Sequence, residues 1–562
     1  MGLGVLDDSV LEHVPGTVNI LDDINKPVPT NESHLKHDKT GTIILVPQPS
    51  DDPNDPLNWP LWKRDLILFL LSMVAILATT LSPILAADTL SISLYMELSF
   101  TKVALLTGWH LFGVGIAGFL FVASARVWGK RHLFLLGNLL MIVTTAWGGA
   151  SNKNYNSELA ARVFQGVALA PFEALVNATV GDLYFVHERG KRMAISNLAT
   201  YGGSFLTPVF VGKIAHTLGW QWSFYLLTIF SGATFPLVFF CIPETAYRRA
   251  SYLNTDITAD EQAPHETAQT KNEDEPSNGE GSSASIDKEA TDEEKAVADS
   301  NGSDSNIPQR DSFSKRLRPF NGRKTDESFF KLVVRPFPLF FQPAIFWACL
   351  TQASLIGWTV LIGVVLAAIF MGPPLWFDEV KTGYMYTGAF IGAILGFLLS
   401  GAMADWTYKI MVKRNHGIYE PEFRIVLVIP QLILGVAGVF GFGITCNDPE
   451  KYGWFWPDFF FALVVAGMVI GAVASALYVT DAYREQSIEI FTCLLIFKNM
   501  LCFGLTFSAY NWILESGILT PFYWMGGIQA FVCLLSIPMY IFGKKNRSFF
   551  HRHDILRILK LK

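Results

Sequence analysis

Long runs of apolar residues alternate with short polar connections along most of the chain. Each run holds about 17 to 25 residues, the length that an α-helix needs to cross the hydrocarbon core of a bilayer. The expected helices cover residues 66–87, 102–122, 132–150, 158–184, 193–215 and 221–243, then 344–371, 383–403, 424–445, 456–480, 488–511 and 521–543. The pattern therefore predicts an all-α polytopic membrane protein with twelve transmembrane helices in two six-helix halves.

The composition supports a bilayer as the solvent of this chain. Of the 562 residues, 51% are hydrophobic and only 16% are charged, and the mean hydropathy is +0.33. Soluble domains carry about 25% charged residues. A net charge of -6 argues against a nucleic-acid partner, because such proteins present basic surfaces. The six cysteines have no paired spacing, so we expect no disulfide framework, no metal site and no cofactor.

Charge and polarity divide the chain into five regions. We expect a cytosolic N-terminal tail at 1–65, the first half at 66–243, a cytosolic and largely disordered central loop at 244–343, the second half at 344–543 and a basic cytosolic tail at 544–562. The N-terminal tail lacks a basic stretch followed by an apolar core, so no cleavable signal peptide is expected. Lys and Arg gather after the second, fourth and eighth spans, which places these connections and both termini in the cytosol. We expect the protein in the plasma membrane.

Two charged residues of the fourth span, Arg162 and Glu173, lie well inside its apolar sequence. At about 100° per residue, a separation of eleven residues places both within roughly 20° of one helix face. A rise of about 1.5 Å per residue keeps them too far apart for direct contact, so we expect Glu173 deeper in a central cavity. A carboxylate there is a proton carrier or a binder of cationic substrate, and the alternative is an interhelical hydrogen bond.

A second intramembrane charge lies in the eleventh span, where Lys498 and Asn499 follow about ten residues of apolar helix. Asp481 is one possible partner of Lys498, which could also neutralise a carboxylate during turnover or bind an anionic group. Further candidates for substrate or proton coupling are Asn197 and Tyr201 on a polar stripe of the fifth span, His110 as a proton relay or a helix contact, and Gln352 as a cavity wall.

Candidate gating residues lie at the cytosolic ends of the spans. They are Arg126, Gly129, Lys130 and Arg131 after the second span, Asp182, Glu188 and Arg189 after the fourth, Asp405 and Arg414 around the eighth, and Asp481 after the tenth. Ion pairs that form in one conformation and break in another would control access to the cavity. The alternative is that these charges only set the topology.

The layout and motifs resemble the major facilitator superfamily. The Gly-turn at Gly129-Lys130-Arg131 resembles the loop signature that latches the cytoplasmic gate in that superfamily, although Arg126 stands near the position of its usual acidic residue. Arg162-Val-Phe-Gln165-Gly166 is similar to the buried-arginine motif that is linked to proton coupling. Gly203, Pro208 and Gly212 resemble a degenerate antiporter signature, although packing alone explains the glycines equally well.

Two further strings resemble the fungal twelve-span drug:proton antiporters, in the group that includes the histidinol and polyamine transporters. Lys413-Arg414-Asn415-His-Gly417-Ile-Tyr-Glu420-Pro421-Glu422-Phe-Arg424 precedes the ninth span, and Asp55-Pro-Leu-Asn58-Trp59 precedes the first. The resemblance implies a secondary transporter without enzymatic activity, working as a monomer on a small-molecule substrate and protons within the lipid bilayer.

Three functions stay open at this point. The first is proton-coupled export of drugs, toxins or a secondary metabolite, which the antiporter-like glycines favour. The second is proton-coupled uptake of polyamines or other organic cations, and the third is a membrane sensor that does not transport. No GxxxxGK[ST] loop is present, so ATP is not the expected energy source.

Overall fold

The computed structural model describes residues 47–249, 310–416, 418–483 and 486–561, together with short stretches between residues 3 and 45. Within α7, the side chains of residues 186, 187, 189–191 and 194 lie outside the described parts. Residues 250–309 also lie outside them, and the predicted disorder of the central loop falls largely on these residues.

The first half consists of six long helices and one short one. They are α2 (Leu61–Thr80), α3 (Thr89–Met96), α4 (Phe100–Trp128), α5 (Arg131–Ala150), α6 (Tyr155–Leu183), α7 (Val186–Leu218) and α8 (Gln221–Cys241). A 3-10 turn, η2 (Pro56–Asn58), precedes α2. Positive φ angles at Gly129 and Gly219 end α4 and α7, because a residue with a side chain rarely adopts this conformation.

The second half again has six long helical segments. They are α13 (Pro343–Phe370), α14 (Glu379–Tyr384) continued by α15 (Thr387–Arg414), η6 (Pro421–Leu427) continued by α16 (Val428–Asn447), α18 (Phe455–Ala482), α19 (Ser487–Ser516), and α20 (Leu519–Leu534) continued by α21 (Ser536–Arg552). Short helices α10 (Phe313–Arg316), α11 (Phe329–Val334) and α12 (Pro336–Leu339) lie before α13, and α17 (Pro449–Tyr452) and α22 (Ile555–Ile558) follow later in the chain.

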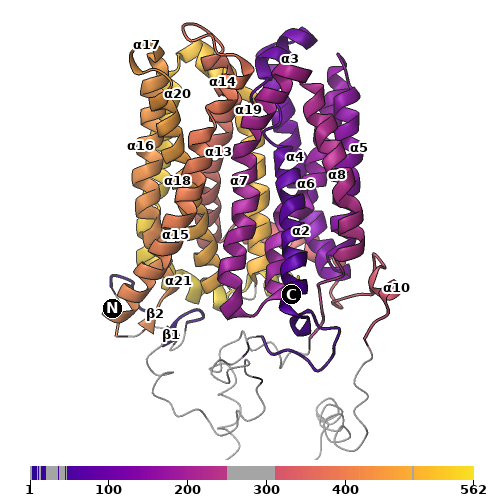
Figure 1. The fold of residues 1–562 in the computed structure, drawn as a ribbon. Helices are drawn as coiled ribbons and strands as arrows, with labels where there is room; N and C mark the ends of the chain where they lie inside the picture. Colours follow the sequence, from indigo (N-terminus) through magenta and orange to yellow (C-terminus); the bar gives the residue numbers. More distant parts are fainter. Residues whose placement is uncertain are drawn as a thin grey trace, which may run out of the picture.

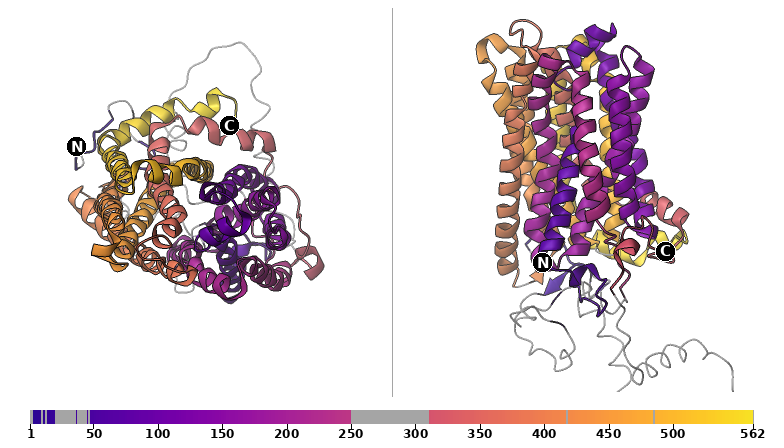
Figure 2. Two further views of the ribbon diagram at one scale, coloured as in Figure 1. Left: turned by 90° about the horizontal axis from the view of Figure 1, so that it is seen from above. Right: turned by 45° about the vertical axis from the view of Figure 1, so that its right-hand side comes forward.

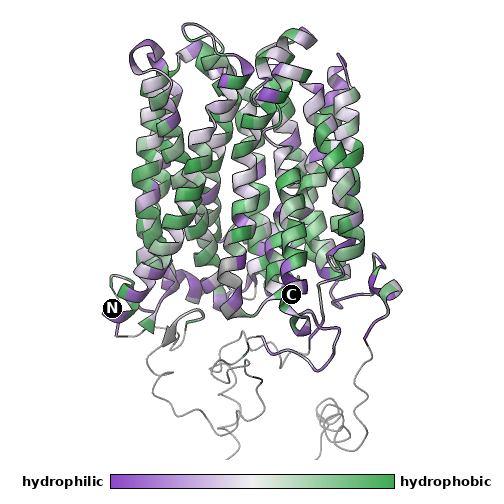
Figure 3. Ribbon diagram, in the orientation of Figure 1, coloured by the Kyte–Doolittle hydropathy of each residue, from purple (hydrophilic) through white to green (hydrophobic). Residues whose placement is uncertain are grey.

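The structure confirms the predicted membrane fold of two six-helix halves, which stand side by side in Figures 1 and 2. Among the described residues, ten helical segments are long and apolar enough to cross a membrane. The remaining two long helices, α2 and α7, carry charged residues in their first turns. Apolar residues dominate the middle of the bundle, and polar residues gather toward its two ends (Figure 3). We call the end that holds both termini the termini face, and the end with α3 and α14 the far face (Figure 1).

The two halves meet along an apolar seam. Helix α4 packs against α19, and α7 packs against α14 and α15. Ala104 and Leu111 of the first half are buried in one cluster with Leu361 and Phe461 of the second half. Burial of apolar side chains by close packing is the force that holds helices together in a membrane, together with polar contacts.

The N-terminal tail contacts the second half of the bundle, although it precedes the first half in sequence. The amide of Leu6 donates to the carbonyl of Ile541 at 3.0 Å, and the hydroxyl of Tyr540 donates to the carbonyl of Leu3 at 2.9 Å. Strand β1 (Val18–Asn19) pairs antiparallel with β2 (Ile418–Tyr419), the strand just before η6. The tail therefore adds a strand to the connection between α15 and α16.

A buried arginine holds this region together. Arg547 of α21 is 2% exposed, and its guanidinium donates to both carboxylate oxygens of Glu422, at 3.0 and 2.8 Å, and to Glu420 at 3.0 Å. It also donates to the carbonyl of Pro15 in the tail, and Lys544 donates to Glu420 at 2.7 Å. The Glu-Pro-Glu string before the ninth span thus binds the C-terminal helix and the N-terminal tail.

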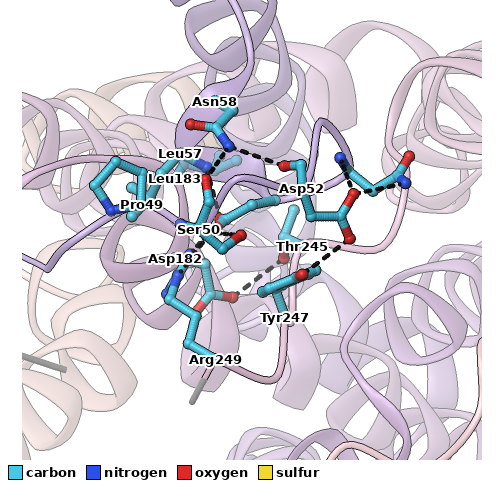
Figure 4. Close-up of polar contacts among 12 residues, drawn as sticks. Pro49, Ser50, Asp52, Leu57, Asn58, Asp182, Leu183, Thr245, Tyr247 and Arg249 are labelled. Carbon is cyan, nitrogen blue, oxygen red and sulfur yellow. Dashed lines mark hydrogen bonds and ion pairs between the residues drawn. The ribbon is translucent and has the colours of Figure 1, made fainter. Parts of the chain in front are cut away.

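Residues 49–58 form a second anchor, on the first half (Figure 4). Arg249 donates to both carboxylate oxygens of Asp55, at 3.1 and 2.7 Å, and the amide of Leu57 donates to the same carboxylate at 3.1 Å. Tyr247 donates to Asp52 at 2.9 Å. Burial acts to raise the pKa of Asp55, but the bonds from Arg249 and Leu57 outweigh it and the pKa falls below its usual value.

Replacing Arg547 tests the first anchor. Arg547→Ala leaves the buried carboxylates of Glu420 and Glu422 with one cation, Lys544, so we expect a loss of about 3 to 5 kcal/mol of stability. Size-exclusion profiles of detergent-solubilised protein after a series of heating steps measure this loss. Arg547→Lys should recover only part of it, because an ammonium cannot bind two carboxylates in a planar fork.

The matched control is Arg557→Ala, since the side chain of Arg557 is 75% exposed. This variant should behave as wild type. Equal heat resistance of Arg547→Ala and Arg557→Ala would contradict the proposed anchor.

Candidate functional site

A cavity of about 160 Å³ lies on the seam between the two halves. Helices of both halves contribute to its wall, so a ligand in it contacts the first and the second half at once. The lining residues include Thr79, Ser82, Thr107, Leu111, Glu173, Thr200, Tyr201, Ser204 and Phe205 from the first half, and Ile356, Thr359, Val360, Tyr386, Met468, Lys498, Asn499 and Cys502 from the second.

Glu173 and Lys498 form an ion pair on the cavity wall. Glu173 lies ten residues before the end of α6 at Leu183, and Lys498 lies eleven residues after the start of α19 at Ser487. At a rise of about 1.5 Å per residue, both lie roughly 15 Å inside the bundle, near the middle of a bilayer core of about 30 Å. The pair therefore joins the two halves at the level of the membrane midplane.

The proposed pairing of Lys498 with Asp481 is wrong. The structure pairs Asp481 with Arg424, at 2.9 Å, and with the hydroxyl of Tyr419. Asp481 lies near the end of α18, whereas Lys498 lies three helical turns inside α19, so the two side chains are at different depths. The acidic partner of Lys498 comes instead from the opposite half.

The remaining cavity wall is apolar with a few polar groups. Asn499 donates to the carbonyl of Leu495 at 2.9 Å, and the hydroxyl of Tyr386 donates to the carbonyl of Gly363 at 2.9 Å. Tyr201 also lines the cavity, with its ring 5.9 Å from that of Phe397 in the other half. The cavity is therefore lined by one carboxylate, one ammonium and several hydroxyl and aromatic groups.

Arg162 is fully buried, and it is not among the residues that line the cavity. Its guanidinium donates to the carbonyl of Leu81 at 2.7 Å, to that of Ser82 at 3.3 Å and to Gln165 at 2.9 Å. Leu81 and Ser82 directly follow α2, so Arg162 binds the carbonyl end of that helix, where a cation is favoured by the helix dipole. His110 is fully buried and interacts electrostatically with Arg162.

Two other predicted site residues lie away from the cavity. The side-chain oxygen of Asn197 accepts a hydrogen bond from the side-chain amide of Asn177 at 2.7 Å, which joins α7 to α6. The side-chain oxygen of Gln352 in α13 is buried without a hydrogen-bond partner among the described residues. Tyr201, on the predicted polar stripe of α7, lines the cavity, as does Ser204 one turn later on the same helix. Asn197, on the same stripe, does not line it.

The antiporter-like residues of α7 pack closely against neighbouring helices. A Cβ added at Gly203 would lie 3.1 Å from the side chain of Ile76 in α2, and one added at Gly212 would collide with the backbone carbonyl of Glu379 in α14. Pro208 is inside α7, and its carbonyl oxygen would lie 2.5 Å from a Cβ at Gly383. Gly212 and Gly383 thus let the halves approach at backbone distance near the far face.

Three predicted gating residues of the first half, Lys130, Asp182 and Glu188, form ion pairs within that half. Lys130 donates to Asp182 at 2.6 Å, and Glu188 pairs with Arg64 at 3.1 Å. The amides of Lys130 and Arg131 donate to the carboxylate of Glu244, which would collide with a Cβ at Gly129. The guanidinium of Arg131 donates to carbonyls at the end of α8, including that of Phe239 at 2.7 Å. The side chain of Arg189 lies outside the described residues.

In the second half, Asp405 and Arg414 are exposed, and neither forms an ion pair with another described residue. The predicted pairing of Asp405 with neighbouring cations is therefore absent from this conformation, as far as the described residues extend. Asp481 is held by Arg424 as described above. The ion pairs of Lys130 and Glu188 in the first half, and of Asp481 in the second, stabilise the termini face of each half separately.

One predicted gating residue does reach across the seam at the termini face. Arg126, at the end of α4, pairs with Glu489 in the first turn of α19 and lies 3.6 Å from Glu327. Arg335, between α11 and α12, donates to Glu327 at 2.6 Å and lies 3.6 Å from Glu489. The sequence reasoning missed Glu489 and Arg335, although an acid in the first turn of an apolar helix signals a nearby cation.

A charge exchange tests this cross-seam cluster. Arg126→Glu places a third carboxylate beside Glu327 and Glu489, and like charges repel, so we expect the termini face to open. Spin labels on Met193 of α7 and Trp406 of α15, both exposed, measure the distance between the halves there. Adding Glu489→Arg should restore the wild-type distance distribution.

Arg318→Glu makes the same charge change at an exposed arginine and serves as the control. Equal distance distributions for Arg126→Glu and wild type would contradict a role of this cluster in holding the halves together.

Comparison with known proteins agrees with the fold. A family model described as Major Facilitator Superfamily matches residues 66–495. The uncharacterized MFS-type transporter C1271.10c of Schizosaccharomyces pombe is 27% identical over 96% of this chain and 94% of its own length, and the protein HOL1 of Saccharomyces cerevisiae is 24% identical over 95% of each. A D-xylose-proton symporter of known structure shares the fold, with a TM-score of 0.54 at 13% identity over 86% of this chain and 99% of its own. The chain belongs to the major facilitator superfamily and is a membrane transporter.

Proposed function

We propose that the chain is a secondary active transporter that exchanges protons for an exported organic cation, such as a drug, a toxin or a secondary metabolite. The ion pair of Glu173 and Lys498 on the cavity wall carries this proposal. The carboxylate of Glu173 can be reached by a cationic substrate, and it lies at a depth where an unpaired charge is costly.

Three cations can bind the carboxylate of Glu173: the ammonium of Lys498, a proton and the positive group of a substrate. In the conformation described here, Lys498 occupies it. A proton or the positive group of a substrate would displace the ammonium, and the two would compete for the same carboxylate. Such competition is the physical basis of exchange, since binding of one ligand releases the other.

The position of the pair also explains how binding could drive the conformational change. Glu173 belongs to α6 of the first half and Lys498 to α19 of the second, so neutralising Glu173 removes an attraction between the halves. A ligand shifts a conformational equilibrium only by its differential interaction with the two states, and this attraction is such a difference. We infer alternating access around the cavity, with the termini face in the cytosol and the protein in the plasma membrane.

Two observations bear on the direction of transport and on the substrate. The close approach at Gly212 and Gly383 supports a sealed far face, which fits the antiporter signature that the glycines resemble. A second candidate is proton-coupled uptake of polyamines, because a cavity of about 160 Å³ with one carboxylate suits a slim aliphatic cation. A sensor without transport has no support from the relatives, which are named as transporters.

Flux into proteoliposomes separates these functions. Purified protein is reconstituted, and uptake of labelled 1-methyl-4-phenylpyridinium and of spermidine is followed with the lumen either more acidic or more alkaline than the medium. Exchange predicts uptake into acidic lumens, whereas symport predicts uptake into alkaline ones. Glu173→Gln should reduce gradient-driven flux at least about tenfold, because an amide neither takes up a proton nor attracts a cation by charge.

Glu450→Gln makes the same change at an exposed carboxylate and should leave flux as in wild type. Gradient-driven flux that survives Glu173→Gln would refute the role of Glu173. Uptake of spermidine alone into alkaline lumens would favour the polyamine function, and flux of neither cation would contradict a cationic substrate.

A further inference from the structure

A polar cluster crosses the seam at the far face, just beyond the cavity-lining residues Ala86 and Thr89. Glu379, the first residue of α14 in the second half, accepts a hydrogen bond from the hydroxyl of Ser91 in α3. The other oxygen of its carboxylate lies 3.3 Å from Nδ1 of His216 in α7. Both partners belong to the first half, so Glu379 links the two halves where the far face is closed.

Asp88 lies directly beside this cluster. It immediately precedes α3, three residues before Ser91. Its neighbour Ala87 and the carbonyl oxygen of Glu379 both lie within 4 Å of a Cβ built on Gly212, so the three segments meet at one point. Asp88 is 1% exposed, and neither of its carboxylate oxygens has a hydrogen-bond partner among the described residues.

An ionised carboxylate in this position would be costly, because burying a charge without a partner is strongly unfavourable. The charged group that acts on Asp88 is Glu379, which repels it. No cation faces it from the packed elements, because α3 and α13 contain no charged residue. Lys102 in the first turn of α4, Lys213 on α7 and Lys381 on α14 are exposed, and His216 interacts with Glu379. Burial and, second, the charge of Glu379 raise the pKa of Asp88 well above its usual range.

We propose that Asp88 is a proton-binding site of the far-face seam, protonated while the seam is closed and released to water when it opens. Opening separates α3 and α7 from α14, which removes the repulsion by Glu379 and hydrates the carboxylate. Nothing in this step requires Glu173 to carry a proton, so the site is additional to the central cavity.

The direction of the pH effect follows from the raised pKa in the closed state. The closed state binds the proton more tightly than the open state, so acid stabilises closure, and this stabilisation is lost as the pH rises through the pKa of the closed state. For one proton, the ratio of open to closed molecules changes by up to about tenfold per pH unit.

Distances across the far face test the proposal. Spin labels are placed on Leu94 of α3 and Trp376 before α14, which are 71% and 70% exposed, in full-length protein in nanodiscs. Between pH 5 and pH 9 we expect a growing population of longer distances. Asp88→Asn, which mimics the protonated acid, should keep the short distance across this range. Glu379→Gln should make the pH-dependent change smaller, because removing this charge brings the pKa of the closed state nearer to that of the open state.

Two further variants make the outcome specific. Glu97→Gln removes an exposed carboxylate of the far face, 79% exposed, and should leave the wild-type transition unchanged. Glu173→Gln should retain the pH transition, which separates this site from the proposed function of the cavity. Three results would overturn the proposal. They are the absence of a pH transition in wild type, its loss in Glu173→Gln, and its retention with the same midpoint in Asp88→Asn.

Discussion

The attraction between Glu173 and Lys498 is the interaction on which the proposed function of this molecule depends. Each side chain would be expensive at the membrane midplane alone, and each offsets the cost of the other. The pair lies on the cavity wall. Because its two helices belong to different halves, it also connects the halves across the seam. Any cation that competes for Glu173 therefore changes how strongly the halves hold together, which connects ligand binding to movement without a further device.

The two ends of the seam are held by different kinds of contact. Near the far face, Gly212 and Gly383 bring backbones together, so closure depends on dispersion at short range and is lost with a small separation. At the termini face, the long side chains of Arg126 and Arg335 reach Glu489. The side chains of Arg335 and Glu489 are each 7% exposed, so separating them without hydration would leave buried charges without partners, which is costly. The far face is thus held by close packing of backbones, and the termini face is held by buried charges.

The helices and their division into halves could be predicted from the sequence because burial in lipid imposes long apolar runs. The position of Glu173 on the cavity wall followed from helical periodicity, which relates residues of one helix. Pairings between helices are not encoded in that periodicity. Asp481, one possible partner of Lys498, is near it in sequence, whereas the partner in the structure is 325 residues away. Glu244 and Glu489 were missed because each stands outside the motif whose cations it binds.

The strings that carry the resemblance to fungal antiporters form the anchors of the tail. Glu420 and Glu422 hold Arg547 and the segment around Pro15 on the second half, and Asp55 holds Arg249 on the first. One tail thus contacts both halves on the same face, and each anchor acts on its own half by neutralising buried carboxylates at the ends of its helices.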